Sequence, residues 1–225
     1  MALSSPLNTP EAVILLHGLA RTRSSMEPLA RYLRQQGYGV INDGYPSRKY
    51  TVEVLAETAI PRALSKVKNA PKVHFVTHSM GGILVRYYLS QHPIENLGRI
   101  VMISPPNQGS EAVDRLGEWF AFKWLNGPAG NQLGTGKDSL PNRLGPTTAD
   151  VGIITGNRSI NWILSSMIDG PDDGKVSVKR AQLEGMKAFR VVSRTHPFIM
   201  KAPEVMEMVV RYLKTGDFSA ASTAP

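Results

Sequence analysis

Residues 72–82 read KVHFVTHSMGG, and the rest of the chain is organised around them. Residues 73–76 are apolar and rich in strand-forming side chains, as expected of a buried strand. The apolar run after Gly81 has helical length and ends before Pro93. Ser79 lies on the turn between the two. The stretch therefore predicts a strand, a sharp turn that carries a serine, and a helix.

A serine on such a strand–turn–helix is typical of a nucleophile elbow. The turn raises the serine oxygen above the sheet, and the helix N-terminus directs its partial positive charge at the site. The usual pattern is Gly-x-Ser-x-Gly, whereas this chain has Thr77 at the first position. A small residue there lets strand and helix approach closely, so the elbow needs corroboration from the rest of the chain.

Strand and helix patterns alternate along the chain. We expect strands at residues 13–16, 38–41, 73–76, 98–104, 151–155 and 189–192, and helices at 24–36, 51–69, 83–89 and 203–213. The first helix is expected to open with a capping box at residues 24–27, and the second to bend or restart at Pro61. This alternation predicts an α/β fold with a mostly parallel central sheet and helices on both faces.

The length of 225 residues favours one domain. We expect a single α/β domain over residues 1–218, with a small lid-like insertion at about residues 107–150 and a disordered tail at residues 219–225. The insertion contains four aromatic residues that are candidates for substrate binding, namely Trp119, Phe120, Phe122 and Trp124. The alternative is that they pack the insertion onto the domain, which is the commoner role of aromatic residues in a helical stretch.

The chain has a formal net charge of +8. Its basic residues are dispersed among acidic ones without a run of like charges, which favours a solvated basic surface over a nucleic-acid partner. A weak attraction to anionic lipid headgroups is the remaining alternative. The sequence shows neither a signal peptide nor a membrane-spanning run, so a cytoplasmic location is the default expectation, with an exported form whose signal was trimmed as the alternative.

The chain has no cysteine, which excludes disulfides and cysteine-ligated metals. We predict no metal and no cofactor. If Ser79 is a nucleophile, the chain must instead supply a histidine base, a carboxylate that orients it, and donors for an oxyanion.

The base should follow the serine and the acid in the sequence. Of the five histidines, only His92 and His196 come after Ser79. His92 falls at the far end of the helix that begins at the elbow, away from the serine. His196 lies on the loop between the last expected strand and the last helix. The sequence therefore predicts His196 as the base.

The acid should lie on the loop after the strand at residues 151–155. Asp169, Asp172 and Asp173 are the carboxylates there. Asp173 is favoured because Gly174 permits the tight turn that aims its carboxylate at the histidine. Asp172 is the runner-up, since spacing alone does not separate adjacent aspartates, and ordinary turn chemistry explains an Asp-Gly pair equally well.

The oxyanion hole should combine the backbone N–H of Met80, directly after the serine, with one from the loop that follows the first strand. Leu19 N–H is the expected second donor. On this loop His17 is expected to be a structural hydrogen-bonding residue. His78 is expected to pack against the neighbouring strands, and His74 to lie in the core or at the sheet edge.

Six segments of the chain together resemble bacterial α/β-hydrolases of the lipase/esterase type, in the group related to GPI-inositol-deacylase-like hydrolases. They are HGLART at residues 17–22, DGYPS at 43–47, THSMGG at 77–82, PPNQGS at 105–110, DGKV at 173–176 and THPF at 195–198. The resemblance implies an α/β-hydrolase fold. It also implies that threonine is acceptable at the first elbow position, because this form recurs in the group, and it favours Asp173 over Asp172. It does not specify a substrate.

The leading hypothesis is a serine carboxylic-ester hydrolase, an esterase or a lipase, that acts through an acyl-enzyme with Ser79, Asp173 and His196. A small-molecule or lipid ester is the expected substrate. Acyl transfer to an alcohol by the same triad is one alternative. A non-catalytic binding module with this fold is another. The sequence does not indicate the oligomeric state.

Overall fold

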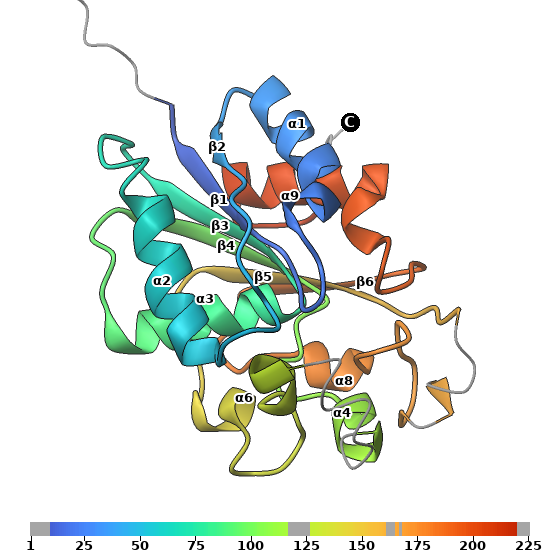
Figure 1. The fold of residues 1–225 in the computed structure, drawn as a ribbon. Helices are drawn as coiled ribbons and strands as arrows, with labels where there is room; N and C mark the ends of the chain where they lie inside the picture. Colours follow the sequence, from blue (N-terminus) through green and yellow to red (C-terminus); the bar gives the residue numbers. More distant parts are fainter. Residues whose placement is uncertain (1–9, 117–126, 161–164, 167, 220–225) are drawn as a thin grey trace, which may run out of the picture.

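The computed structural model describes residues 10–116, 127–160, 165–166 and 168–219. Within these residues six strands form one sheet, in the order β2-β1-β3-β4-β5-β6 (Figure 1). Every neighbouring pair is parallel. The strands are β1 (Ala12–Leu16), β2 (Gly39–Ile41), β3 (Val73–His78), β4 (Leu97–Ile103), β5 (Val151–Gly156) and β6 (Ala188–Val192). The predicted parallel α/β architecture is confirmed.

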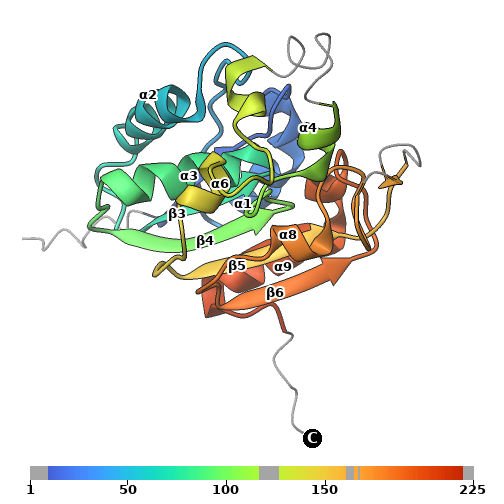
Figure 2. The same cartoon turned by 90° about the horizontal axis from the view of Figure 1, so that it is seen from below.

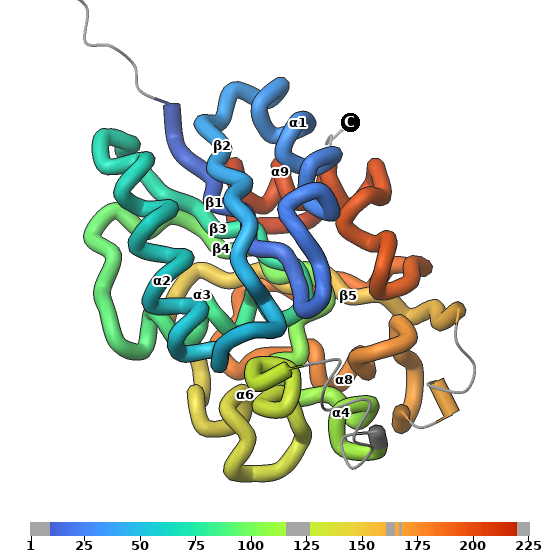
Figure 3. The backbone as a smooth tube through the Cα atoms, in the orientation of Figure 1, coloured from blue at the N-terminus to red at the C-terminus, as the bar shows by residue number. Residues whose placement is uncertain are grey.

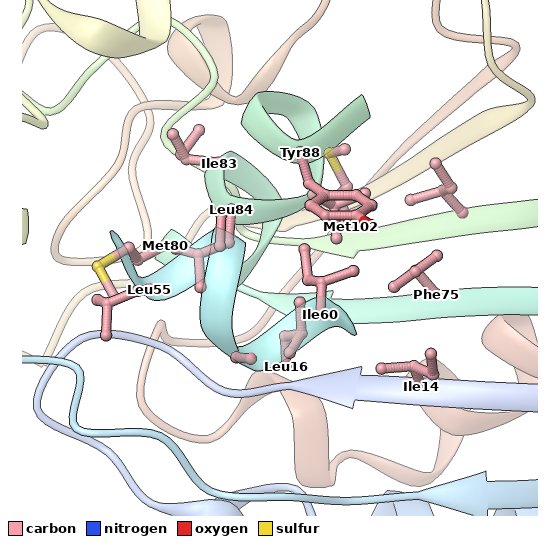
Figure 4. Packing of buried hydrophobic residues seen from close by; sticks show 14 of the residues in the cluster. Ile14, Leu16, Leu55, Ile60, Phe75, Met80, Ile83, Leu84, Tyr88 and Met102 are labelled. Atoms are coloured by element: carbon pink, nitrogen blue, oxygen red, sulfur yellow. The ribbon is translucent and has the colours of Figure 1, made fainter. Parts of the chain in front are cut away.

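Two long helices cover one face of the sheet, α2 (Val52–Leu64) and α3 (Met80–Gln91) (Figures 1 and 2). Successive strand residues point to opposite faces, so alternate residues of β1, such as Ile14 and Leu16, contribute to this side. They pack with apolar residues of the helices, among them Leu55, Ile60 and Leu84 (Figure 4). This cluster is the larger part of the core.

The opposite face is covered by α1 (Glu27–Gln35) and α9 (Pro203–Thr215). Here the other residues of β1, Val13 and Leu15, pack with residues such as Leu29, Val205 and Tyr212. The sheet is therefore buried on both sides, which explains why its strands read as continuous apolar runs.

Two local predictions were wrong. The capping box does not form, because Arg23–Ser25 make a 3-10 turn (η1) in which the Ser25 hydroxyl donates to the carbonyl of Thr22. The helix α1 then begins at Glu27 without a side-chain cap. Pro61 does not restart α2, which continues through it to Leu64.

All strands of a parallel sheet end at one edge, and the short helices gather beyond that edge (Figure 3). They are α4 (Glu111–Leu116), α6 (Leu140–Arg143) and α8 (Val178–Ala181), and a second 3-10 turn, η2 (Ile199–Lys201), precedes α9. An ion pair of 2.6 Å joins Arg180 Nε to Glu111 Oε1, so α4 and α8 lie side by side. The described parts of the predicted insertion thus adjoin the loop after β5.

Other predictions fall outside the described residues. The four aromatic residues of the insertion, at 119–124, lie there, as does all but Ser219 of the expected tail. The boundaries of the single domain stay predictions. No helix in the described part of the chain combines the length and apolar character needed to cross a bilayer.

The close packing of α3 against β1 depends on Gly81. A Cβ atom at this position would lie 2.5 Å from the carbonyl oxygen of Leu16, at the end of β1. Because the obstacle is backbone, a side chain could be fitted only by moving the helix away from the strand.

We expect Gly81→Ala to lower the free energy of unfolding by about 2 kcal/mol through this overpacking. Urea denaturation followed by circular dichroism measures the change. Gly136→Ala is the matched control, because nothing lies within 4 Å of its Cβ position, and it should change stability by less than about 0.5 kcal/mol. Equal stabilities of the two variants would contradict the packing argument.

Candidate active site

Ser79 occupies a strained backbone conformation between β3 and α3. Its φ of 54° and ψ of −124° are unusual for any residue other than glycine. Two backbone hydrogen bonds hold the turn: Ser79 N–H donates to the carbonyl of Ile103 at 2.9 Å, and Gly82 N–H donates to the carbonyl of Ser79 at 3.0 Å. The geometry is that of the predicted elbow.

Two glycines make room for this elbow. A Cβ atom on Gly18 would lie 3.0 Å from Ser79 Cβ and 3.0 Å from His78 Nδ1, so glycine lets the loop after β1 lie directly over the serine. A Cβ atom on Gly82 would lie 3.3 Å from the buried Thr77 hydroxyl oxygen. Gly82, the residue directly after the Gly-x-Ser-x-Gly pattern, therefore faces Thr77, and its missing side chain leaves room for the threonine at the first elbow position.

His196 and Asp173 form a buried pair. His196 Nδ1 is 2.8 Å from Asp173 Oδ2, and His196 N–H donates to the Asp173 carbonyl at 2.8 Å. The side chains are 5% and 0% exposed, so this hydrogen bond is shielded from water. The loop after β6 and the loop after β5 are thus joined through both side chain and backbone.

The Asp173 carboxylate is held in its charged form. Burial alone would raise its pKa, but the positive charge and hydrogen bond of His196 lower it, as does the backbone N–H of Val176. Its other oxygen, Oδ1, accepts from the N–H groups of Lys175 at 3.1 Å and Val176 at 3.0 Å. Gly174 has a φ of +99°, which confirms the predicted tight turn.

Asp172, the predicted runner-up, faces a different set of partners. Its Oδ1 accepts from Gly174 N–H at 2.7 Å, and its Oδ2 accepts from the Ser165 hydroxyl. The structure therefore brings Asp173, and not Asp172, to His196.

His78 lies beneath His196 and is 1% exposed. Its Nε2–H donates to the backbone carbonyl of His196 at 3.0 Å, and the two ring centroids are 4.8 Å apart. The pKa of His78 is lowered well below its usual value, and burial is the main cause. The charges of His196, Arg21 and Lys175 lower it further. The sequence predicted only packing for this residue, whereas it supports the backbone of the candidate base.

The loop after β1 is fixed by His17, as predicted. Its Nδ1–H donates to the Gly18 carbonyl at 2.9 Å, and its Nε2 accepts from Tyr45 N–H at 3.3 Å. The Tyr45 ring stacks on it at 4.0 Å, and the Tyr45 hydroxyl donates to the His17 carbonyl. Burial lowers the pKa of His17, so the neutral ring that this bonding pattern requires is favoured.

Leu19 lies on this loop beside the elbow. The next two amides are engaged, because Ala20 N–H donates to Ser47 Oγ at 3.1 Å and Arg21 N–H donates to the Gly18 carbonyl at 3.3 Å. Met80 opens α3, and the first amides of a helix have no helical acceptor. Both predicted oxyanion donors therefore belong to segments that meet at the serine.

Three of the candidate residues, Leu19, Ser79 and His196, line one pocket, the Ser79 pocket, with a volume of about 80 Å³. Its lining comes from the loops after five strands and from α4: Gly18, Leu19, Arg21, His78, Ser79, Pro106, Ser110, Ala112, Val113, Leu133, Lys175, Val176 and His196. A site at the carboxyl ends of the strands is where open α/β sheets bind their ligands. A roomier hollow of about 460 Å³ beside the end of α3 contains none of the predicted triad.

The remaining histidines lie elsewhere. His74 is buried on β3, an inner strand of the sheet, which agrees with the expected core position and not with the sheet edge. Its Nε2 is 3.1 Å from Glu11, and its Nδ1 accepts from Arg99 N–H. His92 is bonded to Glu57 at the exposed end of α3. No group of three or more potential metal ligands occurs among the described residues.

A scan against protein-family models found no match, and neither did a search of curated proteins. Solved structures, however, match over nearly the whole chain. The mature lipase BlEst2 of Bacillus licheniformis is 17% identical with a TM-score of 0.71, and the match covers 96% of each chain. This protein has an α/β-hydrolase fold.

Two further solved structures share this fold. The phospholipase PlaB of Legionella pneumophila is 17% identical with a TM-score of 0.73, over 92% of this chain and 60% of its own. A thermophilic esterase of Thermogutta terrifontis is 14% identical with a TM-score of 0.59, over 93% and 92% of the two chains. At these identities the likeness concerns the fold, and membership of the GPI-inositol-deacylase-like group stays a prediction.

Several residues of the candidate site were not predicted. Besides His78, they include Gly156, whose Cβ position would lie 2.2 Å from the Arg194 carbonyl oxygen and 3.0 Å from Asp173 Cβ. The only available signal was a glycine at the end of an expected strand, which often marks a close approach of backbone. The charged side chains of the pocket, Arg21 and Lys175, lie in two of the segments that carry the resemblance, but no role was predicted for either of them.

The pKa of Asp173 gives a pH-dependent expectation. The carboxylate pKa is lower in the folded chain than the value of about 3.9 in an unfolded chain. Its ionisation therefore stabilises the fold fully above about pH 4, and the contribution is lost as the pH falls through the folded-state pKa.

We expect Asp173→Asn to lower the free energy of unfolding by about 2 kcal/mol at pH 7, and the deficit relative to the wild type to shrink below about pH 4. Urea denaturation between pH 3 and pH 7 measures both. The exposed Asp169 supplies the control, since Asp169→Asn should match the wild type throughout. A deficit for Asp173→Asn that does not vary with pH would argue against an ionised carboxylate in the folded chain.

Proposed function

We propose that this protein is a serine hydrolase of carboxylic esters. The observation that carries the proposal is the buried hydrogen bond between Asp173 and His196, since His196 lines the same pocket as the strained Ser79. A histidine oriented by a carboxylate beside an exposed serine turn is the arrangement that activates a serine nucleophile. The lipases, the phospholipase and the esterase that share the fold support an ester substrate.

In this mechanism the Ser79 oxygen attacks the ester carbonyl carbon while His196 Nε2 takes the hydroxyl proton. The tetrahedral intermediate collapses, the bond to the alcohol oxygen breaks, and His196 returns the proton to the leaving alkoxide. Water then attacks the acyl-enzyme by the same route, which releases the acid and restores the serine. Asp173 keeps Nδ1 protonated and stabilises the imidazolium that forms in each step.

The N–H groups of Leu19 and Met80 are the proposed donors to the oxyanion. Met80 N–H lies at the start of α3, where the helix dipole also favours negative charge. A single donor of this kind is typically worth about 3 kcal/mol of transition-state stabilisation. The hydrogen bonds of His17 with Gly18 and Tyr45 hold the loop that carries Leu19, so this contribution is preorganised.

Ser79→Ala and His196→Asn should each lower kcat for p-nitrophenyl butyrate by about 10³-fold or more, because the nucleophile or the base is lost. Asp173→Asn should cost a comparable factor, whereas Asp172→Asn should retain activity within about tenfold. Fluorophosphonate labelling and peptide mapping should place the adduct on Ser79.

Four kinds of outcome would redirect this assignment. An adduct on another residue, or full activity of Ser79→Ala, would remove Ser79 from the mechanism. Loss of activity in Asp172→Asn but not in Asp173→Asn would exchange the roles of the two aspartates. If neither the wild type nor any variant hydrolysed the ester, a binding module would be favoured. If the acyl group were transferred to an added alcohol in preference to water, the protein would be an acyltransferase.

His78 is proposed as a positioning residue, because its ring donates to the backbone carbonyl of His196. His78→Leu removes the donor and should lower kcat by about tenfold to a hundredfold at an unchanged KM, since small displacements of a base are costly. His78→Gln retains an N–H donor and should recover part of the rate. Equal kcat values for the wild type and His78→Leu, each measured well below its unfolding temperature, would exclude this role.

A further inference from the structure

Two cationic side chains line the Ser79 pocket. Arg21 comes from the loop after β1 and is partly buried, and Lys175 comes from the loop after β5. The surrounding protein lowers the pKa of the Lys175 ammonium, the nearby Arg21 charge lowers it further, and the Asp173 carboxylate opposes the shift. The two cations therefore repel each other across the pocket, and a bound anion would relieve this repulsion.

Among the described residues that line the pocket, none is an aspartate or a glutamate. The described lining therefore supplies no carboxylate to compensate the two cations. The two acids of α4 that flank its pocket-lining residues already have partners. Glu111 pairs with Arg180 at 2.6 Å, and Asp114 accepts a hydrogen bond from Thr135 N–H at 3.0 Å. Asp173 is buried and bonded to His196 and backbone amides.

The positive charge continues outside the pocket. A neighbouring hollow of about 560 Å³ shares Arg21 and is also lined by Arg48 and Lys49, with no acidic residue among its described lining. Within the described chain, none of these four cations forms an ion pair with a carboxylate, in contrast to Lys66 with Asp43 or Arg180 with Glu111. Unpaired cations of one sign along a cleft attract an anionic ligand.

The other side chains that line the Ser79 pocket include six apolar residues: Leu19, Pro106, Ala112, Val113, Leu133 and Val176. Two of them, Ala112 and Val113, belong to α4. The pocket is thus amphiphilic, because apolar and cationic side chains line it together with Ser79. A neutral ester could contact the apolar residues but would leave the two cations without a partner.

We infer that the substrate is an anionic ester, with an apolar acyl portion against the apolar residues and a phosphate or carboxylate at Arg21 and Lys175. This inference rests on the proposed ester hydrolysis at Ser79 and names its substrate class. Charge-assisted hydrogen bonds to such an anion hold the ester in position for attack. The anion stays attached to the substrate and takes no part in bond breaking.

The test compares an anionic probe, 4-nitrophenyl succinate, with its neutral methyl ester. Rates of nitrophenolate release are corrected with Ser79→Ala for spontaneous hydrolysis. The wild type should have a kcat/KM about tenfold or more higher for the anionic probe. In the double variant Arg21→Gln/Lys175→Gln, the ratio of kcat/KM for the anionic probe to that for its methyl ester should fall to about one. The control is the charge-matched double variant Arg31→Gln/Lys68→Gln. Its substitutions are at exposed positions outside the pocket, so it should keep the wild-type ratio.

A second measurement covers the case in which the double variant does not fold. In the wild type, raising the salt concentration from 0.05 M to 0.5 M should increase KM for the anionic probe and leave KM for its methyl ester unchanged, because salt screens the attraction. Dihexanoylphosphatidic acid against dihexanoylglycerol repeats the comparison with a phosphate. A preference in one probe pair identifies carboxylate or phosphate as the recognised group.

The failures of the two proposals are distinguishable. Hydrolysis of both nitrophenyl probes by Ser79→Ala at the wild-type rate would overturn the proposed function itself. Ser79-dependent hydrolysis with no charge preference in either probe pair, or a preference that Arg21→Gln/Lys175→Gln retains, would leave the esterase proposal standing and overturn the anionic substrate class.

Discussion

The site depends on how closely backbone segments approach one another at the Ser79 turn. Gly81 allows α3 to lie against the end of β1 at Leu16, and Gly18 allows the loop after β1 to lie over the serine. A left-handed conformation at a residue other than glycine costs about 1–3 kcal/mol and persists only where its surroundings dictate it. Here the same contacts that hold the strained turn also bring the Leu19 and Met80 amides to the serine.

The polar part of the site is built on an otherwise apolar sheet. A buried carboxylate is costly unless it is paired and hydrogen-bonded. Asp173 meets this condition through His196 and the amides of Lys175 and Val176. His196 is in turn held at its ring, its N–H and its carbonyl, the last by His78. The proposed base is therefore restrained from both sides, which is the preorganisation that proton transfer would require.

Sequence patterns were most reliable where apolar periodicity decides the structure. All six strands and the four long helices were expected within a few residues of their observed bounds, because a sheet buried on both faces needs apolar runs. The capping-box prediction was wrong because the serines before α1 form a 3-10 turn with a local hydrogen bond of their own. Such competition between neighbouring backbone groups leaves little trace in residue spacing.

By itself, the sequence determined the α/β alternation, the serine turn, and His196 as the histidine that follows it in the right order. Only the tertiary structure decided that Asp173 rather than Asp172 bonds His196, that His78 supports it, and that Arg21 and Lys175 share one pocket. The physical reason is that local periodicity specifies strands and helices, whereas side-chain neighbours at the carboxyl edge depend on how separate loops pack together. Adjacent aspartates look alike in sequence, and their different hydrogen-bond partners appear only in the folded chain.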